Sequence, residues 1–276
     1  MAHGLIQERR AVSVEISARF AFEVEHKASA LLQFEAADLP EQELVRADTR
    51  LTPTKHFARV PAQDNIGERI WIEADGLVEV EYEAQVTAHR LVAELAALDA
   101  LPPHKLPGPA VKFLLDSRYC HSSQFIDFAD AQFGGTRGGA RIAAINDWIA
   151  GHMRYTPGAS GSATTATDTF HSGLGICRDY AHLFVTLARA SAIPARYVAC
   201  YAPGVTPQDF HAVAEVFLAN PEGAGGLWQL VDATGMADLH QAVTIGVGRD
   251  AADVSFLTSF APMRFLSSEV SVTVSR

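Results

Sequence analysis

Residues 173–190, with the sequence GLGICRDYAHLFVTLARA, place Cys177 where a glycine-containing loop leads into an amphipathic helix. Tyr180, Phe184 and Leu187 recur at helical spacing, which predicts a helix packed along its length. The unpaired N–H groups at a helix start favour an anion, so this position favours a thiolate. Cys177 is therefore a candidate nucleophile.

The loop before the cysteine contains two glycines. Gly173 and Gly175 carry no side chain, and we expect them to let a substrate backbone approach the sulfur closely. Asp179 and His182 follow the cysteine on the same helix. We expect both to serve capping and packing, because an acidic residue in the first turn complements the helix dipole.

A thiolate needs a base that can hold a proton and later deliver it to a leaving group. In FHAVAEVFL, His211 begins a strand-like run next to a loop that could form the lip of a cleft, and in LWQLVDATG, Asp232 ends another apolar strand. Two adjacent antiparallel strands would bring the Asp232 carboxylate to the His211 ring and set its orientation. Taken alone, His211 could be a buried core histidine, and Asp232 could cap a turn with Thr234.

Cysteine spacing argues against a disulfide framework and against a metal site. The chain has only Cys120, Cys177 and Cys200, an odd and sparse set, and no pair has the close spacing of zinc ligands. We expect free thiols, no metal and no cofactor. Cys200 is predicted to be a buried strand residue, and Cys120 is left unassigned.

The N-terminal region has the period-two alternation of strands. Residues 12–24, VSVEISARFAFEV, alternate polar and apolar side chains, and residues 68–88 contain two such runs joined by Asp75 and Gly76, a preferred hairpin turn. This predicts an antiparallel, β-sandwich-like domain over residues 1–100. The proline-rich segment 98–112 marks the predicted boundary.

Helical periodicity begins after that boundary. Helices are predicted over residues 123–133 and 138–155, followed by a polar loop over 156–173 and then the cysteine helix. Short strands are predicted at 195–203, 210–218 and 227–234, and a final alternating run at 268–276. Residues 101–276 are therefore predicted to form an α+β domain, and the whole chain to be an α+β protein.

Composition narrows the classes of partner. A chain of 276 residues with 48% hydrophobic residues can bury a sizeable core, and a formal net charge of -10 opposes binding to nucleic acid or an anionic membrane. The opening residues, MAHGLIQERR, lack the apolar run of a secretory signal, which predicts a cytoplasmic protein. We expect a protein or peptide substrate; the oligomeric state is left open.

Four ordered motifs resemble the transglutaminase-like superfamily, in particular its bacterial cysteine-peptidase-like branch with an N-terminal β domain. They are GICRDYAHL around Cys177, RASAIPARYVACY after it, FHAVAEVF with His211 and LVDATG with Asp232. LLDSRYC upstream and TIGVGRDAADVSF downstream extend the resemblance. The chain departs from the family at Val213, where a tryptophan is common and where the cleft wall is expected to change, and at Ala233, where many members have proline.

This resemblance implies a papain-like or transglutaminase-like catalytic domain and mechanism. Cys177 would attack an amide, His211 would act as base and acid, Asp232 would orient the histidine, and the Cys177 backbone N–H would stabilise the oxyanion. Hydrolysis is favoured over transfer because it needs only water. Acyl transfer to an amine and a non-catalytic protein-binding module that keeps the fold remain alternatives.

Overall fold

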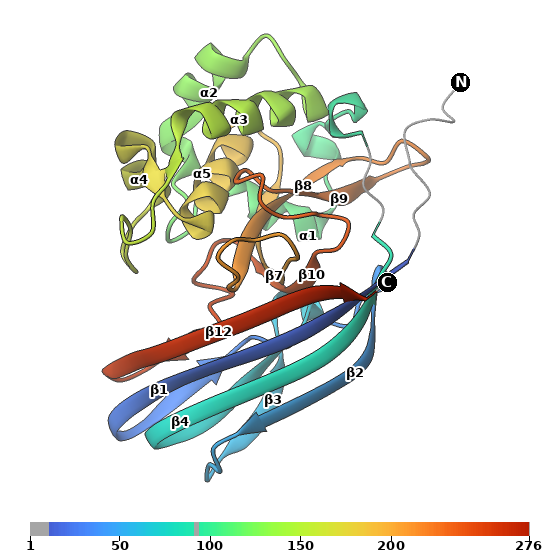
Figure 1. Ribbon diagram of the computed structural model, residues 1–276. Coiled ribbons are helices and arrows are strands. Elements are labelled where there is room, and N and C mark those ends of the chain that lie inside the picture. The colour runs from blue at the N-terminus through green and yellow to red at the C-terminus, as the bar shows by residue number, and fades with distance from the viewer. Residues whose placement is uncertain (1–10, 91–93, 276) are drawn as a thin grey trace.

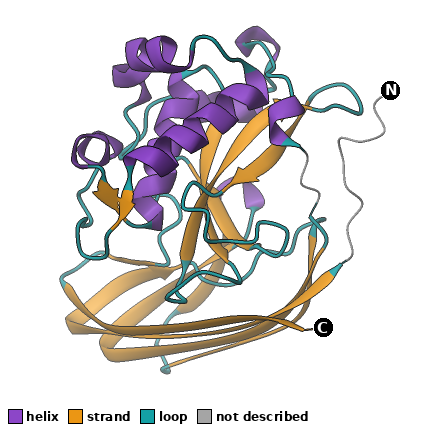
Figure 2. Ribbon diagram, turned by 45° about the horizontal axis from the view of Figure 1, so that its top comes forward, coloured by secondary structure: helices purple, strands orange, loops and turns teal. Residues whose placement is uncertain are grey.

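The computed structural model of the protein describes residues 11–90 and 94–275. Its strands form a six-stranded sheet, a four-stranded sheet and a small two-stranded one. Most of the helices lie at the end of the molecule away from the six-stranded sheet (Figure 2). The α+β class predicted from the sequence is confirmed. No helix among the described residues is long and apolar enough to cross a membrane.

The six-stranded sheet is antiparallel throughout and is built around its two longest strands. β1 pairs with β4 on one side and with β11 and β12 on the other, while β4 also pairs with β2 and β3. Side chains alternate between a buried and a more exposed face, as the period-two sequence pattern predicts. The strands are β1 (Val12–Leu32), β2 (Gln42–Leu51), β3 (Phe57–Pro61), β4 (Glu68–Ala88), β11 (Leu257–Ser259) and β12 (Met263–Ser275).

Both long strands bend at their middle, so the sheet folds over on itself (Figure 1). The pairing passes from Val24 opposite Gly76 to Ala28 opposite Ala74, so that residues 25–27 of β1 face a single residue of β4. β2 and β12 pair with the halves on one side of this bend, and β3 and β11 with the halves on the other. The fold-over encloses apolar side chains and makes the N-terminal region sandwich-like.

The prediction of a hairpin turn at Asp75 and Gly76 is wrong. The runs before and after these residues pair with β1 and not with each other. Gly76 has φ +71°, a conformation that glycine adopts without strain. The Asp-Gly pair adopts a positive φ at the bend of a continuous strand instead of in a hairpin turn. The sequence alone did not reveal that β1 would pair with both runs.

The end of the described chain returns to the first sheet. β12 pairs with β1 from Ser13 to Val24 (Figure 1). The final alternating run was predicted to join the strands of the second domain, and this is wrong, because alternation indicates a half-buried strand but not its partner. The division into residues 1–100 and 101–276 stays a prediction, and the folded sheet draws strands from both parts.

The folded sheet shares its core with the second half of the chain. Tyr201 lies parallel to Tyr82 with ring centroids 6.3 Å apart, and its hydroxyl donates a 2.7 Å hydrogen bond to the carbonyl of Phe34. The fully buried side chain of Gln42 donates to the carbonyl of Thr244 and accepts from the N–H of the same residue. These buried contacts fix how the two parts are placed relative to each other.

The four-stranded sheet is antiparallel, in the order β10-β7-β8-β9, and α5 packs against β7 and β8. Its strands are β7 (Ala195–Tyr201), β8 (His211–Ala219), β9 (Gly226–Val231) and β10 (Val243–Gly248). The helices are α1 (Gly108–Val111), α2 (Ile126–Phe133), α3 (Gly138–His152), α4 (Ala166–Ser172) and α5 (Cys177–Ala190). The predicted helices at 123–133, 138–155 and 177–190 are confirmed as α2, α3 and α5.

The polar loop predicted over residues 156–173 is only partly correct, because it contains α4. The Thr165 hydroxyl accepts from the N–H of Asp168, and the Asp168 carboxylate accepts from the N–H of Thr165. This reciprocal capping satisfies donors that a helix start leaves unpaired. The polar composition of the segment concealed a short helix that begins with such a cap.

Candidate active site

Cys177 is the first residue of α5, as the sequence predicts. The chain reaches it through a short parallel pair in which β5 (Arg154–Tyr155) lies beside β6 (Leu174–Gly175). The side chain packs with Tyr197, Ala212 and Val254 and is 9% exposed. The sulfur thus lies at a helix start, where unpaired N–H groups favour negative charge.

Asp179 holds the start of α5 in place. Its Oδ2 accepts a 2.8 Å hydrogen bond from the N–H of Ile176 and another from the hydroxyl of Ser160. A Cβ at Gly175 would come within 2.5 Å of the Asp179 Cβ. The capping role predicted for Asp179 is confirmed, and Gly175 makes room for this carboxylate.

The prediction that Gly173 and Gly175 admit the substrate backbone does not agree with the structure. Gly173 ends α4 with φ +63°, and a Cβ there would meet the carbonyl of His152 at 3.1 Å. Gly175 faces Asp179. Both glycines are required by local backbone geometry and close packing within the protein.

His211 and Asp232 come together as the strand pairing predicts. His211 is the first residue of β8, and Asp232 follows the last residue of the neighbouring strand β9. The ring Nε2 donates to Asp232 Oδ2 at 3.1 Å, and both side chains are buried. The other ring nitrogen, Nδ1, is buried and has no hydrogen-bond partner among the described residues. Nδ1 is therefore the ring nitrogen that Asp232 does not engage.

Asp232 combines the two roles that the sequence left open. Its Oδ1 accepts from the N–H and the hydroxyl of Thr234, while Oδ2 also accepts from the N–H of Ala237 at 2.8 Å. Burial opposes its charge, but the hydrogen bond from His211 and these backbone and side-chain donors lower the pKa of Asp232. The carboxylate is therefore held ionised and in a fixed orientation beside the imidazole.

The same neighbours favour the charged form of His211. Burial alone would lower its pKa, but the hydrogen bond with Asp232 and the interaction with the Cys177 thiol outweigh burial and raise the pKa of His211 to about 9. At neutral pH the ring is an imidazolium. The charged ring therefore lies between the Asp232 carboxylate and the cleft that contains Cys177.

Tyr155 is a neighbour of Cys177 that sequence analysis did not single out. It packs against the cluster around Cys177, and its hydroxyl interacts with the backbone N–H and the thiol of that residue. Burial and the charge of Cys177 raise the pKa of Tyr155 to about 12, so the phenol keeps its proton. Tyr155 lies beside Gly175 in the β5–β6 pair, a placement that no sequence pattern indicated.

A cleft of about 590 Å³ contains both Cys177 and His211. Arg118, Arg178 at the start of α5, and Phe265 and Ser268 of β12 all line it. The loop before β8, predicted to form a lip, contributes Asp209 and Phe210. The cleft therefore lies between the two sheets, and the folded sheet supplies one of its walls.

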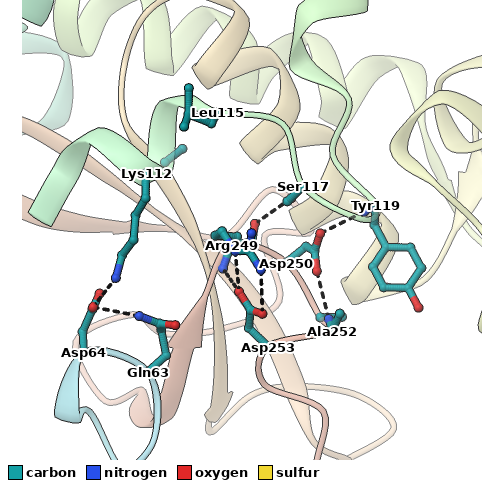
Figure 3. Close-up of polar contacts among 12 residues, drawn as sticks. Gln63, Asp64, Lys112, Leu115, Ser117, Tyr119, Arg249, Asp250, Ala252 and Asp253 are labelled. Atoms are coloured by element: carbon teal, nitrogen blue, oxygen red, sulfur yellow. Dashed lines mark hydrogen bonds and ion pairs between the residues drawn. The ribbon is translucent and has the colours of Figure 1, made fainter.

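The loop after β10 forms a further wall of this cleft through Ala251, Ala252 and Val254. Figure 3 shows how it is fixed: Asp250 accepts from the N–H of Tyr119 at 2.9 Å and from the N–H of Ala252 at 3.0 Å. Arg249 pairs with Asp253 in the same view. Because Asp250 is buried and both of its oxygens are used, the loop has a defined position.

Buried groups of α5 hold the same loop from behind. Arg189 donates to the carbonyl of Arg249 at 2.6 Å and to the carbonyl of Leu115 at 3.1 Å. His182 Nε2 accepts from the N–H of Ala251 at 3.1 Å, and burial lowers the pKa of His182 to about 3, so the ring is neutral. The packing role predicted for His182 is confirmed.

The other residues singled out in the sequence do not line the cleft that contains Cys177. Cys120 and Cys200 are free and fully buried, so Cys200 is the buried strand residue that was predicted. Val213 packs with Val198 and Leu230 in a cluster outside the cleft, so the expectation that it alters the cleft wall is wrong. Residues 11–90 and 94–275 contain no group of three or more His, Cys, Asp or Glu side chains that could hold a metal ion.

The chain is similar to several known proteins. Residues 127–233 match the sequence profile of the Transglutaminase-like superfamily. A crystal structure from Cytophaga hutchinsonii, described as a candidate cysteine protease, is 28% identical over 98% of this chain and 93% of that chain, with a TM-score of 0.91. The periplasmic domain of TgpA from Pseudomonas aeruginosa is 18% identical over 83% of this chain and 72% of that chain, with a TM-score of 0.43.

An uncharacterized protein of Mycobacterium leprae is 29% identical over 119 residues, which are 41% of this chain and 42% of that protein. The match thus spans less than half the length of that relative. Residues 127–233, which include Cys177 and His211 and end just after Asp232, belong to the transglutaminase-like superfamily. The resemblance seen in the sequence is confirmed.

Proposed function

We propose that the protein is a cysteine hydrolase that attacks amide bonds of a protein or peptide through Cys177, His211 and Asp232. The observation that carries the proposal is the position of His211, whose Nε2 is bound to Asp232 while its unpartnered Nδ1 shares a cleft with the thiol. The similarity to a candidate cysteine protease over nearly the whole chain supports the same reaction class.

The chemistry follows from the charges at the site. The Cys177 thiolate attacks the amide carbon, and the carbonyl electrons move onto oxygen. As the tetrahedral intermediate collapses, the C–N bond breaks and the His211 imidazolium gives its Nδ1 proton to the leaving amine. Neutral His211 then takes a proton from water, whose oxygen attacks the thioester, and the thiolate leaves. Asp232 keeps the ring oriented throughout.

Two donors near the sulfur would stabilise the oxyanion. One is the backbone N–H of Cys177, which has no partner within α5 because it is at the helix start. The other is the hydroxyl of Tyr155, which packs against the cluster around Cys177 and stays protonated. Donors that are already placed where charge develops account for a large share of catalysis in acyl transfer.

Selective alkylation tests the nucleophile. Iodoacetamide at pH 6, followed by peptide mapping, should label Cys177 much faster than Cys120 or Cys200, because burial raises the pKa of both of these thiols. Cys200 is the matched internal control, since it lies on the neighbouring strand β7. Labelling of Cys177 no faster than Cys200 would contradict an activated thiolate.

Turnover separates the proposed reaction from its alternatives. A peptide amide should be hydrolysed by the wild type and not by Cys177→Ala, and added primary amine should leave the main product a carboxylic acid. An amide to the added amine as main product would indicate acyl transfer. A partner interaction or cellular phenotype that Cys177→Ala leaves unchanged, with no turnover of any amide, would favour a binding module.

A further inference from the structure

β12 has one unpaired edge, and this edge lies at the cleft that holds the candidate nucleophile. The strand pairs with β1 on one side only. Phe265 and Ser268 of this strand line the same cavity as Cys177 and His211. An exposed strand edge offers a row of backbone donors and acceptors to another extended chain.

The contacts of Val272 show which backbone groups face outward. Its N–H donates to Gln208 Oε1 at 2.6 Å, and its carbonyl accepts from Gln208 Nε2 at 3.2 Å. Both groups therefore point away from β1. In an antiparallel pair this orientation recurs at every second residue, and the register is regular from Ser267 to Ser275. The N–H and C=O of Ser268 and Val270 must face the same way.

The Gln208 side-chain amide takes the place that a backbone amide of an added strand would take. It satisfies the donor and the acceptor of one residue, as the next strand of a sheet would. The outward backbone groups of Ser268, an exposed residue, and of Val270, which is only 5% exposed, have no partner within the part of the chain that the structure describes. The edge runs from Val272 toward Ser268, which lines the cavity. The Ser268 hydroxyl contacts the carboxylate of Asp209, which is two residues before His211.

We propose that the free edge of β12 binds an extended polypeptide as an added strand and leads it to Cys177. The proposal rests on the proposed function and narrows its substrate class to extended peptides whose backbone N–H groups are free on one side of the scissile bond. Backbone pairing would supply affinity without regard to sequence. Side-chain preference would come from the apolar end of the cleft, where the Phe210 and Phe256 rings stack with centroids 4.7 Å apart and Phe265 contacts Phe256.

N-methylation of the substrate tests the edge directly. A decapeptide with a central phenylalanine, selected from a library by Cys177-dependent cleavage, is N-methylated at one residue at a time. Alternate positions on one side of the scissile bond should raise KM about 3- to 10-fold each, the worth of one hydrogen bond, while intervening positions should not. Equal effects at successive positions would overturn the proposal.

Proline on the strand supplies the matched pair of variants. Ser268→Pro removes an outward N–H at the cleft without breaking a hydrogen bond to β1, and Val274→Pro removes one with the same orientation beyond Gln208. Ser268→Pro should raise KM for the decapeptide by a larger factor than KM for a small acyl amide. Val274→Pro should change neither. The same KM for both variants would argue against the edge.

Binding measurements keep this proposal separate from the proposed reaction. If no amide is hydrolysed, the fluorescein-labelled library is titrated with the Cys177→Ala variant. For peptides that bind, N-methylation at alternate positions should raise Kd, and N-methylation at the positions between them should not. Turnover of small amides combined with no binding or cleavage of any decapeptide would refute the edge and leave the hydrolase intact. Binding with the alternation but no turnover would refute the hydrolase alone.

Discussion

His211 Nε2 lies 3.1 Å from Oδ2 of Asp232, although 21 residues separate them in the chain. Pairing of β8 with β9 closes that distance, because Ala214 lies opposite Val231 and places the start of one strand beside the end of the other. The contact thus depends on strand register, which the apolar side chains of both strands determine.

Asp232→Asn should lower kcat/KM about 10²- to 10⁴-fold, because the imidazole loses the carboxylate that orients and charges it. The pH dependence gives a second readout. The pKa of His211 is raised to about 9 partly by Asp232, so the imidazolium persists up to that pH and is lost above it. Without the carboxylate the ring loses its proton at lower pH, and the basic limb of kcat/KM should move down. An unshifted basic limb would show that another group sets it.

Tyr155→Phe should lower kcat about 10²- to 10³-fold with little change in KM, because the hydroxyl acts only on the developing oxyanion. Steady-state kinetics on a peptide amide measure both constants. Iodoacetamide labelling of Cys177 serves as the control and should proceed close to the wild-type rate, since the thiol and His211 are intact. A kcat within about twofold of wild type would remove Tyr155 from the mechanism.

Gly175→Ala should destabilise the protein by about 1–3 kcal/mol and reduce activity, because its Cβ would lie 2.5 Å from the Asp179 Cβ at the start of α5. Denaturant unfolding measures the free energy. Gly135→Ala is the matched control, since a Cβ there would meet nothing within 4 Å. Equal stability of the two variants would mean that the start of α5 shifts to accommodate the added methyl group without a loss of stability.

Asp250→Ala should loosen the loop that forms one cleft wall, because the N–H groups of Tyr119 and Ala252 lose their acceptor. We expect a loss of about 1–3 kcal/mol in the free energy of unfolding and a raised KM. Asp64→Asn is the control, since this residue forms a partly exposed ion pair with Lys112 away from the cleft (Figure 3). An unchanged KM in Asp250→Ala would show that the loop does not contact substrate.

The second half of the chain was predictable because its signals are local. Apolar spacing located α5, and alternation located β8 and β9, so Cys177, His211 and Asp232 were expected near one another. Tyr155 was missed because it reaches Cys177 through a two-residue parallel pair, too short to leave a pattern. The reciprocal cap of Thr165 and Asp168 was a readable signal for α4 that the polar surroundings obscured.

The N-terminal half shows what local pattern cannot determine. Alternation located β1, β4 and β12 but not which strand pairs with which, and the Asp75–Gly76 dipeptide was interpreted as a hairpin although both of its flanks pair with β1. Partner choice depends on buried side chains distant in sequence, such as Tyr82 against Tyr201. These contacts appear only once the chain is folded.

The pairing of β12 with β1 has a consequence for how the protein is made. Glu23 and Arg264 form an ion pair across 241 residues, so β1 emerges from the ribosome long before its partner on that side exists. Contacts of such long range require a large loop to close and form late. One wall of the cleft would thus be completed only after β12 has been synthesised, and a nascent chain that already contains Cys177, His211 and Asp232 would lack the strand next to them.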